Sequence, residues 1–335
     1  MTRFLRHTLH PERYHGRARD QRPPFFEGWY FKCVDPTEQH RFAFIPGIIW
    51  GPQSHAFVQV LEGGRGRVHY HEFPVEDFEA VEDRFEVKVG KSRFSLDEIV
   101  LDIDRPEQRV VGQLRFEKPI PWPVSLTSPG IMGWYAWVPF MECYHGVLSL
   151  DHTLHGSLTV DGQLIDFTGG RGYIEKDWGR SFPEAWIWFQ TNHFDHPGTS
   201  LTGSIAIIPW VHTSFPGFII GLLHEGHLYR FATYTGAKTE RLVVTERTID
   251  WVVADKRHRL EMSVTQGPGS LFGLLKGPNS VEMGKRVAET MSATVSVRLT
   301  TRRDGHVLFE DAGRHAGLEV HEVENRLLKI VEAAR

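Results

Sequence analysis

The stretch Phe25-Phe26-Glu27-Gly28-Trp29-Tyr30 recurs in altered form as Phe182-Pro183-Glu184-Ala185-Trp186-Ile187, with phenylalanine, glutamate and tryptophan at the same spacing. Further matches follow in the same order along the chain. Residues 41–46 match 204–209, residues 56–61 match 218–223, and Asp161-Gly162 with Gly170-Arg171 matches Asp304-Gly305 with Gly313-Arg314. Ordered self-similarity of this kind predicts a tandem duplication.

Strand-like patterns fill both halves, for example in residues 84–89, 110–116, 157–160 and 294–299. The Asp-Gly pairs between such runs suit tight hairpins, which need positive φ, and hairpins imply antiparallel pairing. We therefore predict an all-β protein with an N-terminal domain over residues 1–180 and a C-terminal domain over 181–335, each a barrel or sandwich. Helices are predicted only over residues 285–291 and 324–334, the latter with Leu327, Leu328 and Val331 on one face.

Composition excludes several classes of protein. The 335 residues are 41% hydrophobic and 24% charged, and the net charge of −4 gives no general attraction for nucleic acid. The first twenty residues do not have the pattern of a signal peptide, and no apolar run has bilayer length, which together predict the cytoplasm. Cys33 and Cys143 belong to no CxxC pattern, so we expect reduced thiols.

One apolar segment is predicted to be a long loop with little regular structure, and a shorter one in the second half could act in the same way. Residues 119–144 are rich in aromatic residues and proline, and residues 267–279 place leucine and phenylalanine among glycines and prolines. Such segments can cover a pocket, contact a membrane as a weak peripheral interaction, or pack between domains. Packing between domains is the favoured interpretation.

The motifs around the repeated tryptophans resemble those of the tocopherol cyclase family. They are Phe25-Phe26-Glu27-Gly28-Trp29-Tyr30-Phe31-Lys32, Gly172-Tyr173-Ile174-Glu175-Lys176-Asp177-Trp178-Gly179 and Trp186-Ile187-Trp188-Phe189-Gln190-Thr191-Asn192. The resemblance implies two lipocalin-like β domains, related to carotenoid hydratase-like proteins, with an apolar pocket near the domain junction. It also implies a cyclase or hydratase that acts without a cofactor on a prenylated quinol or polyene. The plant setting does not carry over, and oligomeric state is not indicated.

The implied reaction adds a phenolic hydroxyl across a prenyl double bond, and this requires an acid. A carboxyl group in an apolar pocket has a raised pKa and stays protonated near neutral pH. Asp177 is the first candidate because it has no equivalent in the second half. The neighbouring Lys176 opposes this role unless its side chain points to the other face of the strand.

Glu27 is the second candidate for the acid, since Glu27, Trp29 and Phe31 share one face of an extended strand. Its counterpart Glu184 is expected on the same face as the stripe of Trp186, Trp188, Gln190 and Asn192. These rings would stabilise a carbocation, the amides would orient a phenol, and His193 would accept the phenolic proton. The predicted substrate-binding residues are Trp29, Tyr30, Trp178, Trp186, Trp188, Gln190 and Asn192.

Structural roles explain several of these residues equally well. The tryptophans Trp29 and Trp186 can plug barrel ends rather than line a pocket. Asp177 can pair with Lys176, Arg171 or Arg180. Glu27 and Glu184 recur in both halves, which favours a shared buried ion pair with the duplicated Arg171 and Arg314.

Other chemistries lack support in the sequence. His69-Tyr70-His71 with Glu76 resembles a cupin ligand set, but no second cupin motif follows, so we predict no metal. The glycine-rich stretches lack the context of a phosphate-binding loop, and no GxSxG motif is present, so neither a nucleotide nor hydrolase chemistry is expected. Besides a cyclase or hydratase, a noncatalytic carrier of a hydrophobic ligand and a structural or assembly protein remain open.

Overall fold

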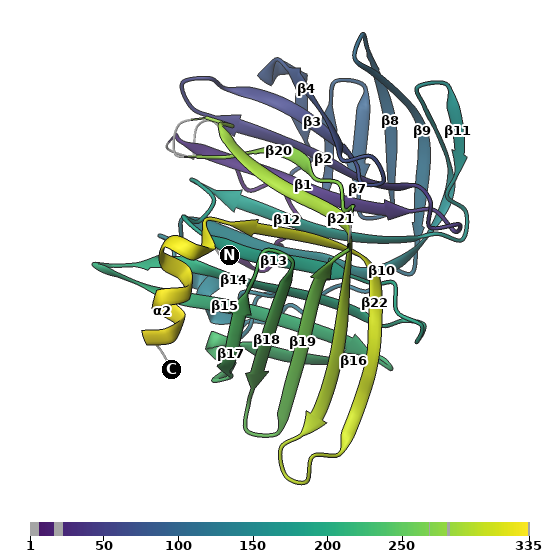
Figure 1. The fold of residues 1–335 in the computed structure, drawn as a ribbon. Helices are drawn as coiled ribbons and strands as arrows, with labels where there is room; N and C mark the ends of the chain where they lie inside the picture. Colours follow the sequence, from purple (N-terminus) through teal and green to yellow (C-terminus); the bar gives the residue numbers. More distant parts are fainter. Residues whose placement is uncertain (1–6, 17–22, 268, 280–281, 334–335) are drawn as a thin grey trace. The chain divides into compact units, whose positions relative to one another are not determined.

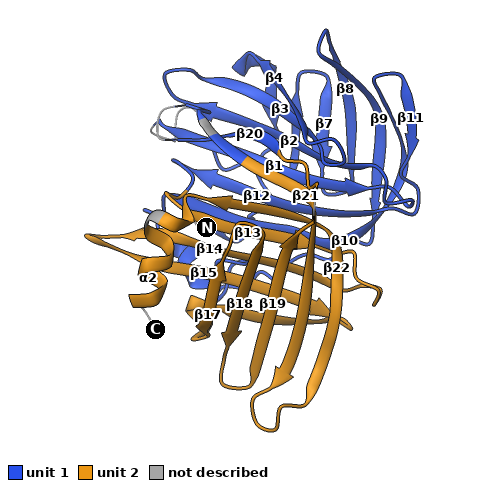
Figure 2. Cartoon of the chain, in the orientation of Figure 1, with its two compact units in different colours: residues 1–182, 273–287 blue, residues 183–272, 288–335 orange. Residues whose placement is uncertain are grey.

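The chain forms two compact units. The computed structural model describes residues 7–16, 23–267, 269–279 and 282–333. The first unit comprises residues 1–182 and 273–287, and the second comprises residues 183–272 and 288–335 (Figure 2). Residues 273–287 therefore belong with the first unit although they stand in the second half of the sequence.

An antiparallel sheet with the order β4-β3-β2-β1-β12-β10-β9-β8-β7-β6-β5 makes up most of the first unit (Figure 1), and β11 pairs with β10. Its strands are β1 (Phe25–Val34), β2 (Arg41–Trp50), β3 (His55–Glu62), β4 (Arg67–Phe73), β5 (Phe78–Ala80), β6 (Glu86–Val89), β7 (Ser92–Ser95), β8 (Glu98–Arg105), β9 (Gln108–Glu117), β10 (Cys143–Val160), β11 (Gln163–Asp166) and β12 (Arg171–Gly179). Short 3₁₀ turns are η1 (Val75–Asp77) and η2 (Gly133–Trp137).

A second antiparallel sheet has the order β16-β15-β14-β13-β22-β21-β19-β18-β17. Its strands are β13 (Trp186–Thr191), β14 (Ser200–Trp210), β15 (Thr213–His224), β16 (His227–Ala232), β17 (Lys238–Val244), β18 (Thr248–Ala254), β19 (His258–Gln266), β21 (Lys285–Thr301) and β22 (Val307–His321), with β20 (Gly273–Gly277) paired to β21. A 3₁₀ turn, η3 (Thr233–Thr235), follows β16.

The two sheets share one topology. In each, the first strand of the repeat lies between the second strand and the last one, so that β13 and β22 take the places of β1 and β12. The predicted fold class, two tandem lipocalin-like antiparallel β domains with few helices, is confirmed.

The repeated tryptophans nevertheless face opposite ways. Trp29 and Phe31 belong to the core of the first unit, whereas in the second unit the core residues of β13 are Ile187 and Phe189. Trp186 therefore lies on the face away from its core. Because side chains alternate along a strand, a shift of one residue in the repeat moves every side chain to the other face.

One predicted helix is wrong and the other is confirmed. Residues 285–291 belong to β21, because Val287, Glu289 and Met291 are buried at every second position, which is the period of a strand. Near the C-terminus, a π-helical turn, η4 (Val323–Leu327), leads into α2 (Leu328–Ala333). Leu327 and Val331 are buried there, as expected for the apolar face.

The predicted loop over residues 119–144 is largely confirmed, whereas residues 267–279 contain the strand β20. Between β9 and β10, the chain contains only η2 and an isolated bridge between Val124 and Pro129. Within 267–279, β20 lies beside β3, where Gln59 Nε2 donates to the Lys276 carbonyl at 2.9 Å and the Lys276 amide donates to Gln59 Oε1 at 2.8 Å.

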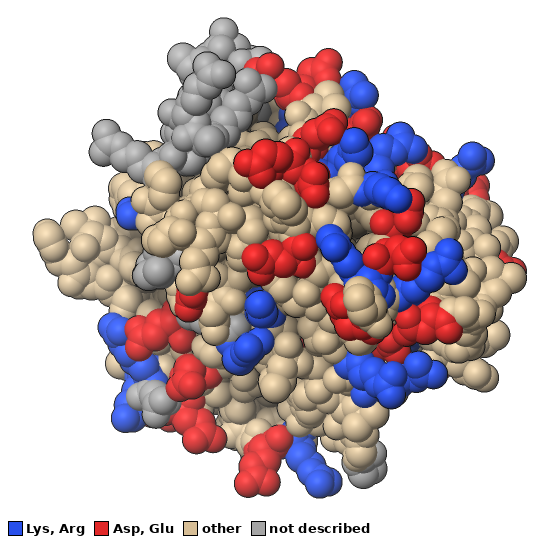
Figure 3. All heavy atoms as spheres, turned by 90° about the horizontal axis from the view of Figure 1, so that it is seen from above, with Lys and Arg blue, Asp and Glu red and all other residues tan. Residues whose placement is uncertain are grey.

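Basic and acidic side chains of the described residues are intermingled on the face shown in Figure 3. No helix among the described residues is long and apolar enough to cross a membrane.

Candidate active site

Strand β12 carries polar side chains on both of its faces. Tyr173, Glu175 and Asp177 alternate with Ile174 and Lys176, and Ile174 is part of the core of the first unit. Asp177 therefore lies on the face away from the core, opposite in direction to Lys176. Asp177 is a candidate acid only if Lys176 points to the other face of the strand, and Lys176 does so.

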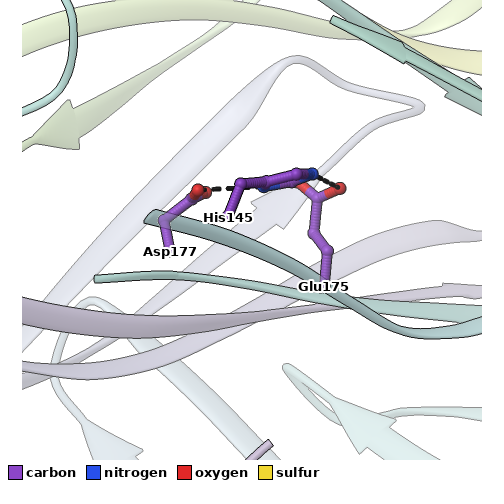
Figure 4. A group of neighbouring side chains, drawn as sticks. All are labelled: His145, Glu175 and Asp177. Atoms are coloured by element: carbon purple, nitrogen blue, oxygen red, sulfur yellow. Dashed lines mark hydrogen bonds and ion pairs between the residues drawn. The ribbon is translucent and has the colours of Figure 1, made fainter. Parts of the chain in front are cut away.

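His145 of the neighbouring strand β10 links the two carboxylates of this face (Figure 4). Its Nδ1 lies 2.9 Å from Asp177 Oδ1, and its Nε2 lies 3.8 Å from Glu175 Oε2. The Tyr173 hydroxyl donates to Glu175 Oε2 at 2.5 Å. Asp177 is the most accessible member, with 27% of its side chain exposed against 16% for His145 and 6% for Glu175.

The electrostatics of the cluster keep a proton on His145. Burial by itself lowers the pKa of this imidazole, but the charges of Asp177 and Glu175 and the hydrogen bond to Asp177 outweigh it and raise the pKa to about 9. At neutral pH the cluster therefore contains an imidazolium between two carboxyl groups. Such an arrangement can give up a proton on one side and accept one on the other.

The same three side chains lie close enough together that they could hold a metal ion. One ligand atom from each of His145, Glu175 and Asp177 lies within 4.8 Å of the others. In the structure, however, the imidazole itself serves as counter-ion to both carboxylates. We therefore interpret the cluster as a proton-transfer site.

Glu27 lies on the core face, in a buried ion pair with Lys176. The Lys176 ammonium is 2.5 Å from Glu27 Oε1, and both side chains are fully buried. Burial raises the pKa of Glu27 and lowers that of Lys176, while the charge of each partner opposes the shift of the other. Hydrogen bonds to both charged groups favour the ionised pair.

Two tryptophans of the first unit, Trp29 and Trp178, lie beside this ion pair. Lys176 Nζ lies 5.0 Å from the ring centroid of Trp29 and 4.5 Å from that of Trp178. Trp29 is fully buried and stacks on Phe85, while Trp178 stacks on Tyr144. Of the predicted substrate-binding residues in this unit, only Tyr30 shares the face of Asp177, because it stands opposite Glu175 in the pairing of β1 with β12.

In the second unit, the stripe on β13 is buried on the face away from the core. The Trp186 indole donates to Glu319 Oε2 at 2.7 Å and stacks on His321. Trp188 stands opposite Glu319, and Gln190 opposite Gly317. Two further predicted residues lie just beyond β13, where Asn192 is buried and His193 forms an isolated bridge with Arg314.

Several predicted ion pairs are wrong. Asp177 pairs with His145 rather than with Lys176, Arg171 or Arg180. Glu184 lies outside β13, is exposed, and pairs with Arg326, so it does not repeat the environment of Glu27. The duplicated arginines bind other carboxylates, Arg171 to Asp151 and Arg314 to Asp195.

Sequence reasoning missed His145, Glu175 and Tyr173. The spacing of Tyr173, Glu175 and Asp177 at every second residue of one strand was a usable signal, because such residues share a face. No comparable signal existed for His145, which reaches Asp177 only through the pairing of β10 with β12.

Comparisons with known proteins agree with this architecture. The profile of the family described as tocopherol cyclase-like matches residues 113–322. The "Probable tocopherol cyclase, chloroplastic" of Oryza sativa subsp. japonica is 26% identical over 218 residues, covering 59% of this chain and 43% of that protein. The "Tocopherol cyclase, chloroplastic" of Zea mays is 32% identical over 110 residues, covering 31% of this chain and 23% of that protein. These matches span less than half the length of either relative.

A solved structure shows the same fold. The crystal structure of CghA superposes with a TM-score of 0.53 at 11% identity, covering 89% of this chain and 88% of that chain.

Proposed function

Because the chain belongs to the tocopherol cyclase-like family, we propose that it closes a ring in an apolar, prenylated substrate by proton transfer. The observation that carries the proposal is the position of His145 between Asp177 and Glu175, whose carboxylates raise the pKa of its imidazole. Adding a hydroxyl across a double bond changes no oxidation state. The reaction needs only a proton donor for carbon and an acceptor for the hydroxyl proton.

The cluster supplies both the proton donor and the proton acceptor on one face of two neighbouring strands. The proton of His145 reaches the double bond through Asp177, its more exposed partner, while Glu175 accepts the proton that the phenolic oxygen loses as the C–O bond forms. The proton on Glu175 is then released to solvent, and the bare Nδ1 of His145 takes up a proton through Asp177, which has 27% of its side chain exposed. The cycle therefore leaves the protein unchanged, and the product has the mass of the substrate.

Aromatic side chains would stabilise the cation that develops on the prenyl carbon. We propose Tyr30 as a substrate-binding residue, because it stands opposite Glu175 in the pairing of β1 with β12. For Trp186, Trp188, Gln190 and Asn192 in the second unit, substrate binding stays a prediction from the sequence. For Glu27, Trp29 and Trp178 we propose a structural role, because Glu27 is paired with Lys176 and the two tryptophan rings are stacked on other aromatic side chains of the unit. The role of His193 as acceptor of the phenolic proton stays a prediction from the sequence.

Two variants test the proposal with a panel of prenylated quinols and polyenes. Asp177→Asn and His145→Gln nearly preserve shape, and each should lower turnover by at least about 100-fold, the usual contribution of a positioned acid or base. Ligand binding, measured by native mass spectrometry, should survive in both. An isomeric product identifies cyclisation, and a gain of one water identifies hydration, the alternative chemistry.

The runner-up function is a noncatalytic carrier of the same class of ligand. Binding across the panel without any conversion by the wild-type protein would favour the carrier and refute the enzyme. Loss of folding in Asp177→Asn would instead identify a structural role for the His145–Asp177 pair.

We further propose weak peripheral contact with membranes through the segment between β9 and β10. Residues 119–141 contain no Asp, Glu, Lys or Arg. Leu126 and Phe140 expose 67% and 59% of their surface. Exposed apolar side chains without charge favour insertion at a lipid interface.

Flotation with zwitterionic liposomes tests this contact. Leu126→Ser with Phe140→Ser should weaken binding, whereas Leu164→Ser, at a site on β11 that is 70% exposed, should not. Absence of liposome binding by the wild-type protein at low and moderate salt would refute the proposal.

A further inference from the structure

Residues 7–16, here called the N-terminal strap, are bound to the core face of β1 and β12. The Glu27 carboxylate accepts the amide N–H groups of His15, at 2.9 and 3.1 Å, and of Gly16, at 3.0 Å. In the other direction, Lys176 Nζ donates to the carbonyl oxygens of Pro11, at 3.0 Å, and Arg13, at 2.5 Å. The buried ion pair thus holds the strap with both of its charges.

Trp29 adds a further bond, since its indole N–H donates to the carbonyl of Glu12 at 3.1 Å. All of these hydrogen bonds go to main-chain atoms of the strap. The strap is therefore held through its main-chain amide and carbonyl groups, and the side chains of Glu12 and Arg13 take no part in these bonds.

The strap lies directly behind the two residues of the proton-transfer pair. Lys176 and Trp178 flank Asp177 in β12, and Trp178 contacts the ring of His15 at a centroid distance of 4.7 Å. Gly146 follows His145 in β10, and a Cβ atom at this position would lie 3.3 Å from Pro11 Cβ. The backbone that carries His145 and Asp177 on one face is thus packed against the strap on the other.

We propose that the strap is a positioning element for the His145–Asp177 pair, acting through Lys176 and Trp178. Its catalytic consequence rests on the function proposed above, whereas its effect on the pair itself does not. The rate of proton transfer depends on the distance between donor and acceptor, and a displacement of about 1 Å can lower a rate by about 100-fold. Loosening the strap lets β12 shift relative to β10 and lengthens the 2.9 Å hydrogen bond.

The experiment loosens the strap in two independent ways without changing His145 or Asp177. The double variant Glu27→Gln with Lys176→Met removes the ammonium that holds the two strap carbonyls. Gly16→Ala acts from the strap itself, because the added Cβ would lie 2.1 Å from Phe25 Cε1. Gly64→Ala is the matched control, since its Cβ would meet only ordinary contacts at 3.5 Å.

Three quantities are measured on each full-length variant. Hydrogen exchange at the amides of His15 and Gly16 reports release of the strap, NMR titration gives the pKa of His145, and turnover on the prenylated panel gives kcat and KM. We expect exchange to rise at least about tenfold, the pKa of His145 to fall from about 9 towards 6.5, and kcat to fall more than KM rises. The control should match the wild type in all three.

Two results would overturn the proposal. One is faster exchange in the strap with an unchanged pKa of His145, which would make the strap a purely structural element. The other is unchanged exchange in the double variant, which would mean that the Glu27–Lys176 pair does not hold the strap. If the wild-type protein shows no turnover at all, the proposed function fails, yet the first two measurements still decide on the strap.

Discussion

The buried ion pair of Glu27 and Lys176 gives the sharpest test of how the first unit is held together. Lys176→Met removes the ammonium and leaves the Glu27 carboxylate buried without its counter-ion. Glu27→Gln removes the carboxylate and leaves the Lys176 ammonium buried without its counter-ion. The double variant removes both charges but keeps side chains of similar volume.

The expected magnitudes differ between the single and double variants. Leaving one charge of a buried pair without its partner costs about 3–5 kcal/mol of unfolding free energy. In the double variant no charge is stranded, and the loss is chiefly that of the two hydrogen bonds from Lys176 to strap carbonyls, worth about 1 kcal/mol each. We therefore expect the double variant to cost about 2 kcal/mol, less than either single one.

The unfolding free energy is measured by urea titration, with hydrogen exchange at the amides of β12 as the probe of unfolding in the first unit. Lys88→Met is the matched control, because Lys88 and Glu79 form an exposed ion pair at 3.0 Å. Exposed pairs are worth at most about 1 kcal/mol. The reasoning is refuted if Lys176→Met costs no more than Lys88→Met, or if the double variant costs the sum of the two single ones.

Three other expectations follow from the structure. Turnover should stay level up to about pH 8 and fall through an apparent pKa near 9 as His145 loses its proton; a rate that rises across pH 9 would contradict this. The charges of Asp177 and Glu175 on His145 also stabilise the folded protein by about 3 kcal/mol, a contribution that is fully present below pH 6.5 and is lost as pH rises through about 9. His145→Gln should therefore flatten the pH dependence of the unfolding free energy. In the second unit, Trp186→Phe removes the hydrogen bond to Glu319 and should cost about 1.5–3 kcal/mol there, with exchange at β12 amides unchanged; an unaltered stability would show that the bond contributes nothing.

Much of the fold could be predicted because its signals are local. Alternating burial and Asp-Gly turns indicate antiparallel hairpins within short windows, and the repeated motifs indicate two domains of one topology. The error over residues 285–291 arose from a segment too short to show its period, since the same two-residue alternation continues through the rest of β21.

The register of the repeat was harder to predict. Aligning Trp29 with Trp186 matched residue types but not faces, because one tryptophan packs into its core and the other faces away from it. Glu184 was therefore paired with Glu27 in error, and its contact with Arg326 in η4 is a long-range one that no spacing reveals.

By itself, the sequence determined the all-β class, the duplication, the family and Asp177 as a candidate, because each can be read from short motifs or from a comparison of such motifs along the chain. Only the tertiary structure decided that Lys176 turns away from Asp177 to bind Glu27, and that His145 from another strand completes the site. The physical reason is that an ion pair or a proton-transfer pair forms across strands, where the pairing register sets which side chains meet.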